Sequence, residues 1–379
     1  MGDQRTFASM AWDAKGKVTR RERFLAEMDA VIPWSRLLAL IQPYYPKAGQ
    51  GRQPLGLEKM LRIYFLQQWF NLSDPQAEDA IYDSESMRRF ARVELGDDVV
   101  PDESTILRFR HLLEQHGLTK AIFDAVAALL EERRLLLRAG TIVDATIIAA
   151  PSSTKNATAT RDPEMKQTRK GRNWYFGMKL HIGADKRGIV HTVLATDARV
   201  PDITQLPHLL HGQEREVFGD QAYWKEADRQ AFVARGVRYR INRRPSRRPL
   251  SPRWRMINRA RSRTRACGEH PFRVVKQLWG FAKVSYRGLA KNLARAQTMF
   301  ALTNLYQLRR ELLPIGTRSA LLPASRQPKS SVAACIPAKT ECAAAFPSDR
   351  VSYYVKHSMH NDLCRASLGH LKYRIWCVE

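Results

Sequence analysis

The chain has 379 residues, 44% of them hydrophobic, and carries 63 lysine and arginine residues against 37 aspartate and glutamate residues, a formal net charge of +26. This length allows one large or two ordinary domains with a substantial core. No run approaches the roughly 20 apolar residues of a membrane-spanning helix, and the N-terminal stretch lacks the apolar segment of a signal peptide. We therefore expect a cytoplasmic protein. The charge excess indicates a polyanionic partner, most often nucleic acid; general solubility is the alternative.

The first 130 or so residues show helical periodicity. In 54–70, Leu57, Leu61 and Phe65 recur at helical intervals. Residues 101–118 begin with helix-capping residue types and stop at a glycine, and 120–140 likewise end on Gly140. We predict an all-α N-terminal domain over residues 1–135.

After Gly140 the pattern changes to that of strands. "TIVDATIIAA" (141–150) is rich in β-branched residues, and 174–185 and 188–196 resemble the two strands of a hairpin. The polar stretch 151–173 predicts a loop, and 215–224 and 237–242 predict short strands. Helical character returns near residue 264 and closes with an apolar helix over 293–313.

Two further segments differ from this pattern. Residues 235–265 contain thirteen arginines and no acid, with Trp254 and Tyr239 among them. Guanidinium groups bind phosphates and aromatic rings stack on unpaired bases, so this segment predicts DNA contact; a disordered, solvated loop is the alternative. Residues 314–379 show no sustained period and predict a poorly ordered C-terminal extension.

The five cysteines are most simply free thiols. Four of them lie in the last 45 residues and none forms a CxxC pair. The spacing supports neither a zinc site nor a disulfide scaffold.

Three acids stand out by position. Asp144 interrupts an apolar strand, Asp220 follows a short strand, and Glu269 lies among basic residues, with Arg265 and Lys276 spaced to share its helix face. Singly, each has a structural explanation: a hairpin cap, a turn, and an ion pair with Arg265 or Arg273. Together they would repel one another unless a cation neutralised them, and carboxylates suit Mg²⁺ or Mn²⁺. Two such ions about 4 Å apart serve phosphoryl transfer.

From about residue 18 to 313 the chain resembles the DDE transposases of bacterial insertion sequences, in particular the insertion-sequence-five group. The resemblance is carried by stretches such as "PDESTILRFRHLLEQHGL", "GTIVDATIIAAPSSTKN", "LPHLLHGQE", "GDQAYW" and "EHPFRVVKQLWGFAKVSYRGLAKN". It implies an α/β fold: an RNase H-like catalytic core, a mixed sheet flanked by helices, over 136–313. Ser262 stands where the family signature has a tyrosine, and Cys267 and Gly268 where it usually has a basic and an apolar residue.

The resemblance also implies function and site residues. Asp144, Asp220 and Glu269 match the three catalytic acids, which would bind two Mg²⁺ ions, with Mn²⁺ as a substitute. Cleavage at transposon ends would free a 3′-hydroxyl that attacks target DNA. The N-terminal domain is the candidate for binding the terminal inverted repeats; the alternative is that its helices serve packing alone. A homodimer is expected in the synaptic complex. When bound to DNA, the protein would be associated with the nucleoid. The alternatives are a degenerate copy that only binds DNA and a related nuclease that only hydrolyses. Expected DNA contacts are Arg265, Arg273, Lys276, Arg243, Arg244, Arg247, Arg248 and Trp254.

Overall fold

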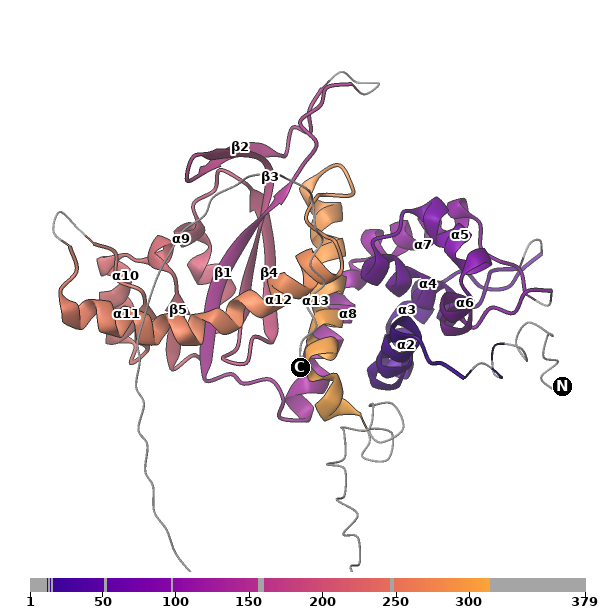
Figure 1. Ribbon diagram of the computed structural model, residues 1–379, viewed down its shortest axis with the longest axis horizontal. Helices are drawn as coiled ribbons and strands as arrows, with labels where there is room; N and C mark the ends of the chain where they lie inside the picture. Colours follow the sequence, from indigo (N-terminus) through magenta and orange to yellow (C-terminus); the bar gives the residue numbers. More distant parts are fainter. Residues whose placement is uncertain are drawn as a thin grey trace, which may run out of the picture. The chain divides into compact units, whose positions relative to one another are not determined.

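The computed structural model describes residues 12, 14, 16–50, 53–96, 98–155, 160–245 and 249–313. Arg247, Arg248 and the predicted extension 314–379 lie outside the described residues. The described chain begins with helices and continues into a six-stranded sheet flanked by helices (Figure 1), which confirms the predicted fold class. In this part of the chain, no helix has the length and apolar character needed to cross a membrane.

Three of the N-terminal helices begin at residues whose side chains cap them. Thr19 and Ser73 each form a reciprocal capping box, and the Asp102 carboxylate accepts a hydrogen bond from the Thr105 backbone N–H at 2.9 Å. The helix predicted over 120–140 already ends at Glu132, ahead of Arg134 in the left-handed region. The helices are α2 (Arg20–Val31), α3 (Trp34–Ile41), the 3₁₀ turn η1 (Gln42–Tyr44), α4 (Leu57–Phe70), α5 (Asp74–Asp83), α6 (Glu85–Ala91), α7 (Glu103–Gln115) and α8 (Leu118–Glu132).

The sheet is mixed. Its strands are β1 (Gly140–Ala149), β2 (Lys166–Lys170), β3 (Asn173–Ala184), β4 (Val190–Asp197), β5 (Glu216–Gly219) and β6 (Arg238–Ile241). The order is β2-β3-β1-β5-β6, with β4 also paired to β3. β3 runs antiparallel to β1, β2 and β4, whereas β5 is parallel to β1 and β6. The predicted hairpin is therefore confirmed as β3–β4.

Two predictions about the polar segments were wrong in part. Residues 151–173, predicted as a loop, contain β2, because β3 extends beyond β4 and its open edge pairs with Lys166–Lys170. Most side chains of β2 are exposed, so the strand has no apolar alternation to reveal it. The helix predicted from about 264 begins twelve residues earlier as α11 (Pro252–Arg265), where Ser251 caps the first turn.

One long helix, α13 (Leu289–Leu312), packs against both α8 and β4 (Figure 1). A continuous apolar cluster runs from Leu25 to Leu313 and includes residues of the N-terminal helices, β3, β4 and α13. Asn304 joins α13 to β4, because its side chain accepts from the Val190 N–H at 2.9 Å and donates to the Val190 carbonyl at 2.7 Å. The catalytic sheet thus rests on a well-packed support.

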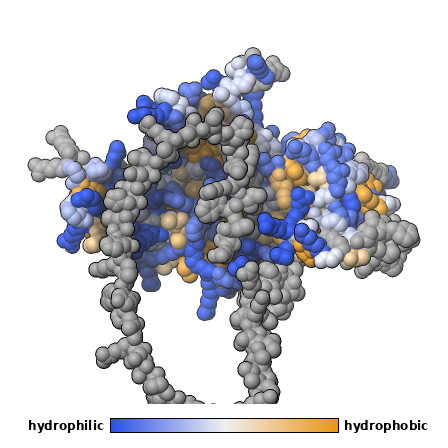
Figure 2. Space-filling model, in the orientation of Figure 1, coloured by the Kyte–Doolittle hydropathy of each residue, from blue (hydrophilic) through white to orange (hydrophobic). Residues whose placement is uncertain are grey.

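The remaining helical segments surround the ends of β1 and β5. They are α9 (Asp202–Gln205), η2 (Leu206–Leu209), η3 (Gln221–Tyr223), α10 (Glu226–Ala234), α11, η4 (Ala266–Gly268), α12 (Glu269–Arg273) and the π-helical turn η5 (Val274–Leu278). A smaller apolar cluster that includes Val143, Leu209, Val217 and Tyr223 packs here. The face shown in Figure 2 is largely hydrophilic, with hydrophobic patches over the N-terminal helices.

Candidate active site

The three predicted acids come from three segments of the chain that meet at one cavity. Asp144 is in β1, just beyond Gly140–Ile142, the part of the strand that pairs with β5. Asp220 follows the last residue of β5 and caps η3, its carboxylate accepting from the Ala222 N–H at 2.8 Å. Glu269 is the first residue of α12. All three line one cavity of about 570 Å³.

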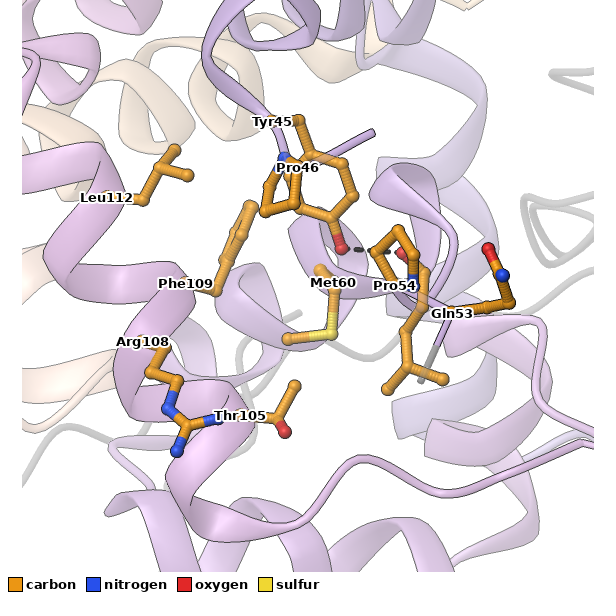
Figure 3. A pocket seen from close by; sticks show the side chains of 10 residues that line it. Tyr45, Pro46, Gln53, Pro54, Met60, Thr105, Arg108, Phe109 and Leu112 are labelled. Carbon is orange, nitrogen blue, oxygen red and sulfur yellow. Dashed lines mark hydrogen bonds between the residues drawn. The ribbon is translucent and has the colours of Figure 1, made fainter. Parts of the chain in front are cut away.

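A second cavity, of about 280 Å³, lies among the N-terminal helices (Figure 3). Apolar side chains such as Met60, Phe109 and Leu112 line it, and the Tyr45 hydroxyl donates to the Leu55 carbonyl at 2.5 Å. Arg108 is the one charged residue among its described lining residues. With no carboxylate there, acid-dependent chemistry belongs to the cavity of the three acids.

The surroundings of Asp144 explain how a carboxylate is accommodated in this strand. Its side chain is 14% exposed, and one oxygen accepts from the Ala145 N–H at 2.9 Å. Burial raises its pKa to about 6, while Arg265 and the Ala145 N–H act to lower it, and the charges of Asp220 and Glu269 raise it further. The acid is therefore electrostatically coupled to both of its predicted partners.

Arg265 is the counter-ion of this cluster. Its guanidinium Nη2 lies 2.9 Å from Glu269 Oε1, and Nη1 lies 3.7 Å from Asp144 Oδ2. The i,i+4 spacing predicted from the sequence is confirmed, although the segment is a composite of α, 3₁₀ and π turns rather than one regular helix. A positive charge thus already stands between the first and third acids.

The residues present fit divalent ions in their chemistry. Carboxylate oxygens are the ligands Mg²⁺ prefers, and the Arg265 guanidinium occupies the place of a cation between two of them. As the side chains lie, no group of three His, Cys, Asp or Glu residues within the described ranges comes close enough to hold one ion. Glu269 is 56% exposed, so its side chain has room to turn toward Asp144 once Arg265 moves away.

The glycine at position 268, which departs from the family signature, has a steric explanation. A Cβ atom at this position would lie 2.7 Å from Ile142 Cγ2 and 4.0 Å from the Asp144 Cβ. Glycine therefore allows η4 to approach β1 closely and brings Glu269 toward Asp144. Of the other two departures, Ser262 accepts a hydrogen bond from the Asn242 amide at 2.9 Å, and Cys267 is a free thiol; the other four cysteines lie outside the described residues.

The residues predicted to contact DNA differ in exposure and in the groups they contact. Lys276 turns to β1, where its ammonium donates to Thr146 Oγ1 at 3.1 Å and to the Ile147 carbonyl at 3.0 Å, and burial, followed by the charge of Lys170, lowers its pKa. Arg244 and Arg273 are exposed. Arg243 lies over the Trp254 ring, 4.8 Å from its centroid, and Arg261 lies over the same ring at 5.6 Å.

Several lining residues were not predicted from the sequence. Lys179 of β3 lies 2.9 Å from Asp202 Oδ1 and donates to the Val200 carbonyl at 2.8 Å; both side chains line the cavity of the acids. Arg169 and Lys170 of β2 line it as well. The available signal was a charged residue inside the apolar run "GMKLHIG", the same signal that marked Asp144.

Comparison with known proteins identifies the family of the chain. Residues 12–112 match the family described as "Transposase domain (DUF772)", and residues 136–305 match the family described as "Transposase DDE domain". The structure titled "Crystal structure of the Mos1 Strand Transfer Complex" is similar over 59% of this chain and 80% of that chain, at 14% identity and a TM-score of 0.17, so the assignment rests on the two families. Because they match consecutive parts that together make up most of its length, the chain belongs to the DDE transposases of insertion sequences, enzymes that cleave and recombine DNA.

Proposed function

We propose that Asp144, Asp220 and Glu269 are the catalytic acids of this transposase and hold two divalent ions, Mg²⁺ with Mn²⁺ as a substitute, at a transposon end. The support is that all three acids line one cavity and that the charges of Asp220 and Glu269 reach Asp144. When bound, the ions supply the positive charge that stabilises the attacking and leaving oxygens of phosphodiester cleavage. We assign the protein to the insertion-sequence-five group on the stretches quoted above.

Arg265 has two partners in this scheme. In the structure it neutralises Asp144 and Glu269. If divalent ions bound these acids, the Arg265 guanidinium would be free to bind a DNA phosphate bidentately. Lys276 joins η5 to β1 through its hydrogen bonds to Thr146 and Ile147.

The DNA backbone follows the basic rim of the cavity. β2 contributes Arg169 and Lys170, which line the cavity, and Trp174, at the start of β3 and opposite Arg169, is 68% exposed. Arg243, Arg244 and Arg273 are assigned to the same DNA path, and Arg247 and Arg248 are assigned with them by sequence. Because these contacts are to phosphates, affinity falls steeply with added salt.

The helical region 1–135 binds the terminal inverted repeats, and a homodimer joins two transposon ends in the synaptic complex, associated with the nucleoid in the cytoplasm. Support for the first assignment is that residues 12–112 match a transposase family outside the DDE domain. The second follows from the reaction, since two ends have to be cut and joined together.

The test replaces each acid by its uncharged isostere. Asp144→Asn, Asp220→Asn and Glu269→Gln should each reduce Mg²⁺-dependent cleavage of a terminal-repeat substrate to background while leaving DNA affinity within a few-fold. The matched control is Glu226→Gln, an exposed glutamate of α10 paired to Arg229, which should cleave normally. Cleavage that survives any of the three substitutions contradicts the assignment.

Product analysis separates the remaining functions. Joining of the cleaved 3′ end to a target plasmid identifies a transposase, and free ends alone identify a hydrolytic nuclease. A wild-type protein that binds the repeats but leaves them uncut in Mg²⁺ and in Mn²⁺ identifies a degenerate copy.

A further inference from the structure

The helix that leads to the third acid carries an excess of arginine. α11 contains six arginines and no acid along its fourteen residues. Two of the six have partners in the protein: Arg261 donates to the Ile241 carbonyl at 2.6 Å, and Arg265 pairs with two of the acids. The other four are exposed, and within the described residues their guanidinium groups form no ion pair or hydrogen bond. They are Arg253, Arg255, Arg259 and Arg263.

One face of α11 holds the helix to the protein. Asn258 accepts a hydrogen bond from the Arg243 N–H at 3.0 Å and donates one to the Arg243 carbonyl at 3.0 Å. The guanidinium groups of Arg243 and Arg261 lie over the Trp254 ring, 4.8 and 5.6 Å from its centroid. Trp254, Asn258 and Arg261 recur at helical intervals and therefore share one side of the helix. This inner face fixes α11 to the segment that follows β6.

The opposite face carries a row of positive charge, which we call the arginine stripe and which consists of Arg255, Arg259 and Arg263. Each is four residues from the next, so with a rise of 1.5 Å per residue they follow one another about 6 Å apart along the axis. Like charges at this spacing destabilise a helix, and no carboxylate of the described residues pairs with them. The stripe therefore fits a partner with regularly spaced negative charge, such as the backbone of DNA.

The composition of the outer face favours phosphate contact over sequence readout. Apart from its arginines, the exposed residues of α11 are Pro252, Met256 and Ala260, whose side chains cannot hydrogen-bond to a base edge. Base-specific surfaces combine arginine with amide or hydroxyl side chains. Contacts of cations to phosphates carry no sequence information and act on any duplex.

The arginine stripe is separate from the cavity of the acids. None of its three arginines lines that cavity, whereas Arg265, at the end of the same helix, does. α11 leads through η4 into α12, where Glu269 lies (Figure 1). DNA bound along the stripe is therefore DNA beyond the bond that reacts. In a joining reaction the target is the duplex of arbitrary sequence, and it extends past that bond on both sides.

We propose that the arginine stripe of α11 is the site at which the transposase holds target DNA, through sequence-independent contacts to its phosphates. The proposal rests on the proposed function for the joining reaction itself. It gives target capture a surface of its own, distinct from the acids that cut and from the helical region assigned to the terminal repeats. Loss of the stripe should therefore affect joining more than cleavage.

The experiment removes the three charges of the stripe in the full-length protein. The triple variant Arg255→Gln, Arg259→Gln, Arg263→Gln should unfold at the same denaturant concentration as the wild type or a higher one, because glutamine has nearly the helix propensity of arginine and the like charges are gone. On a duplex of unrelated sequence, the slope of log binding constant against log salt should decrease by about 3, one for each phosphate contact. Joining of a precut transposon end to a target plasmid should fall about tenfold, while cleavage of a terminal-repeat substrate stays within a few-fold.

Two controls separate charge from side-chain identity and position. Substitution of the same three arginines by lysine keeps the charge and should keep most of the joining. A second triple variant makes the same change of net charge at exposed arginines that do not line the cavity, and it should join target DNA almost as well as the wild type. Its substitutions are Arg133→Gln, Arg215→Gln and Arg310→Gln.

The outcomes separate this proposal from the one it rests on. Equal losses of cleavage and joining would show that the stripe binds the transposon end, and unchanged joining with an unchanged salt slope would show that it binds no DNA; either result overturns the proposal. A wild-type protein that neither cuts nor joins overturns the proposed function. The salt slope on unrelated duplex then decides this proposal: a decrease of about 3 in the glutamine variant supports it, and an unchanged slope refutes it.

Discussion

The side of the sheet covered by α13 and the edge where β5 ends bury different kinds of side chain. On the α13 side, Phe300 and Leu305 are fully buried, and the buried amides of Asn292 and Asn304 have hydrogen-bond partners for both donor and acceptor. At the β5 edge, the carboxylate of Asp144 is only 14% exposed, and burial raises its pKa to about 6.

The difference indicates a division of labour within one compact unit, Met1–Ser325. Burial of the Asp144 carboxylate near two other acids lowers the stability of the apo protein, and a large apolar cluster offsets that loss. Substitutions at the two regions should therefore separate stability from activity.

The largest effect on stability is expected in the α13 region. Phe300→Ala should lower the free energy of unfolding by about 3–5 kcal/mol, since it removes a fully buried ring. Denaturant titration followed by circular dichroism measures the change. Phe300→Leu, which keeps most of the apolar volume, should cost clearly less. In both variants the folded fraction should cleave DNA at the wild-type rate, and a loss of cleavage beyond the loss of folded protein would argue against separate roles.

The same contrast decides which features could be predicted from the sequence. The α13 helix and β1 could be predicted because their burial imposes a regular apolar pattern. Asp144 could be identified because a charged residue violates that pattern. β2 escaped prediction because its side chains face solvent and its pairing depends on the free edge of β3.

The surroundings of the acids were harder to predict than the acids. Lys179 and Asp202 are 23 positions apart and meet only because β4 returns the chain beside β3. Arg265 was predicted to contact DNA, and its pairing with Asp144 depends on how closely η4 approaches β1, which Gly268 controls. Long-range geometry of this kind leaves no periodic signal in a single sequence.

At the β5 edge we expect an effect of intermediate size on the free energy of unfolding, and here the substitution should increase it. The folded-state pKa of Asp144, about 6, lies above its usual value of 3.8, so the folded protein binds this proton more tightly than the unfolded chain. Stability in EDTA should therefore fall as pH rises from 3.8 to about 6. Asp144→Asn removes this loss and should be on the order of 2–3 kcal/mol more stable than the wild type near neutral pH.

Denaturant titrations across this pH range check the sign. The advantage of Asp144→Asn should disappear below the ordinary pKa of the carboxyl group, and Mg²⁺ should reduce it near neutral pH, because the cation stabilises the ionised form. Equal stability of the two proteins at all pH values would show that Asp144 is not strained. Asp124→Asn, at an exposed position, should show no such pH-dependent gain.

The smallest effect on stability is expected at the rim of the site, where the side chains are exposed. Trp174→Ala, at a position 68% exposed, should change the free energy of unfolding by no more than about 0.5 kcal/mol. Its affinity for a transposon-end oligonucleotide should nevertheless fall by an amount equivalent to about 1–3 kcal/mol, since an aromatic ring beside Arg169 on a basic hairpin suits stacking on a base.

Fluorescence anisotropy at fixed salt measures this loss, with Val233→Ala of α10, an exposed apolar residue that does not line the cavity, as the matched control. Trp174→Phe should retain most of the affinity, because it keeps a stacking face. If Trp174→Ala binds as tightly as the control, the DNA does not pass over the β2–β3 hairpin, and the basic rim is confined to the α11 side of the cavity.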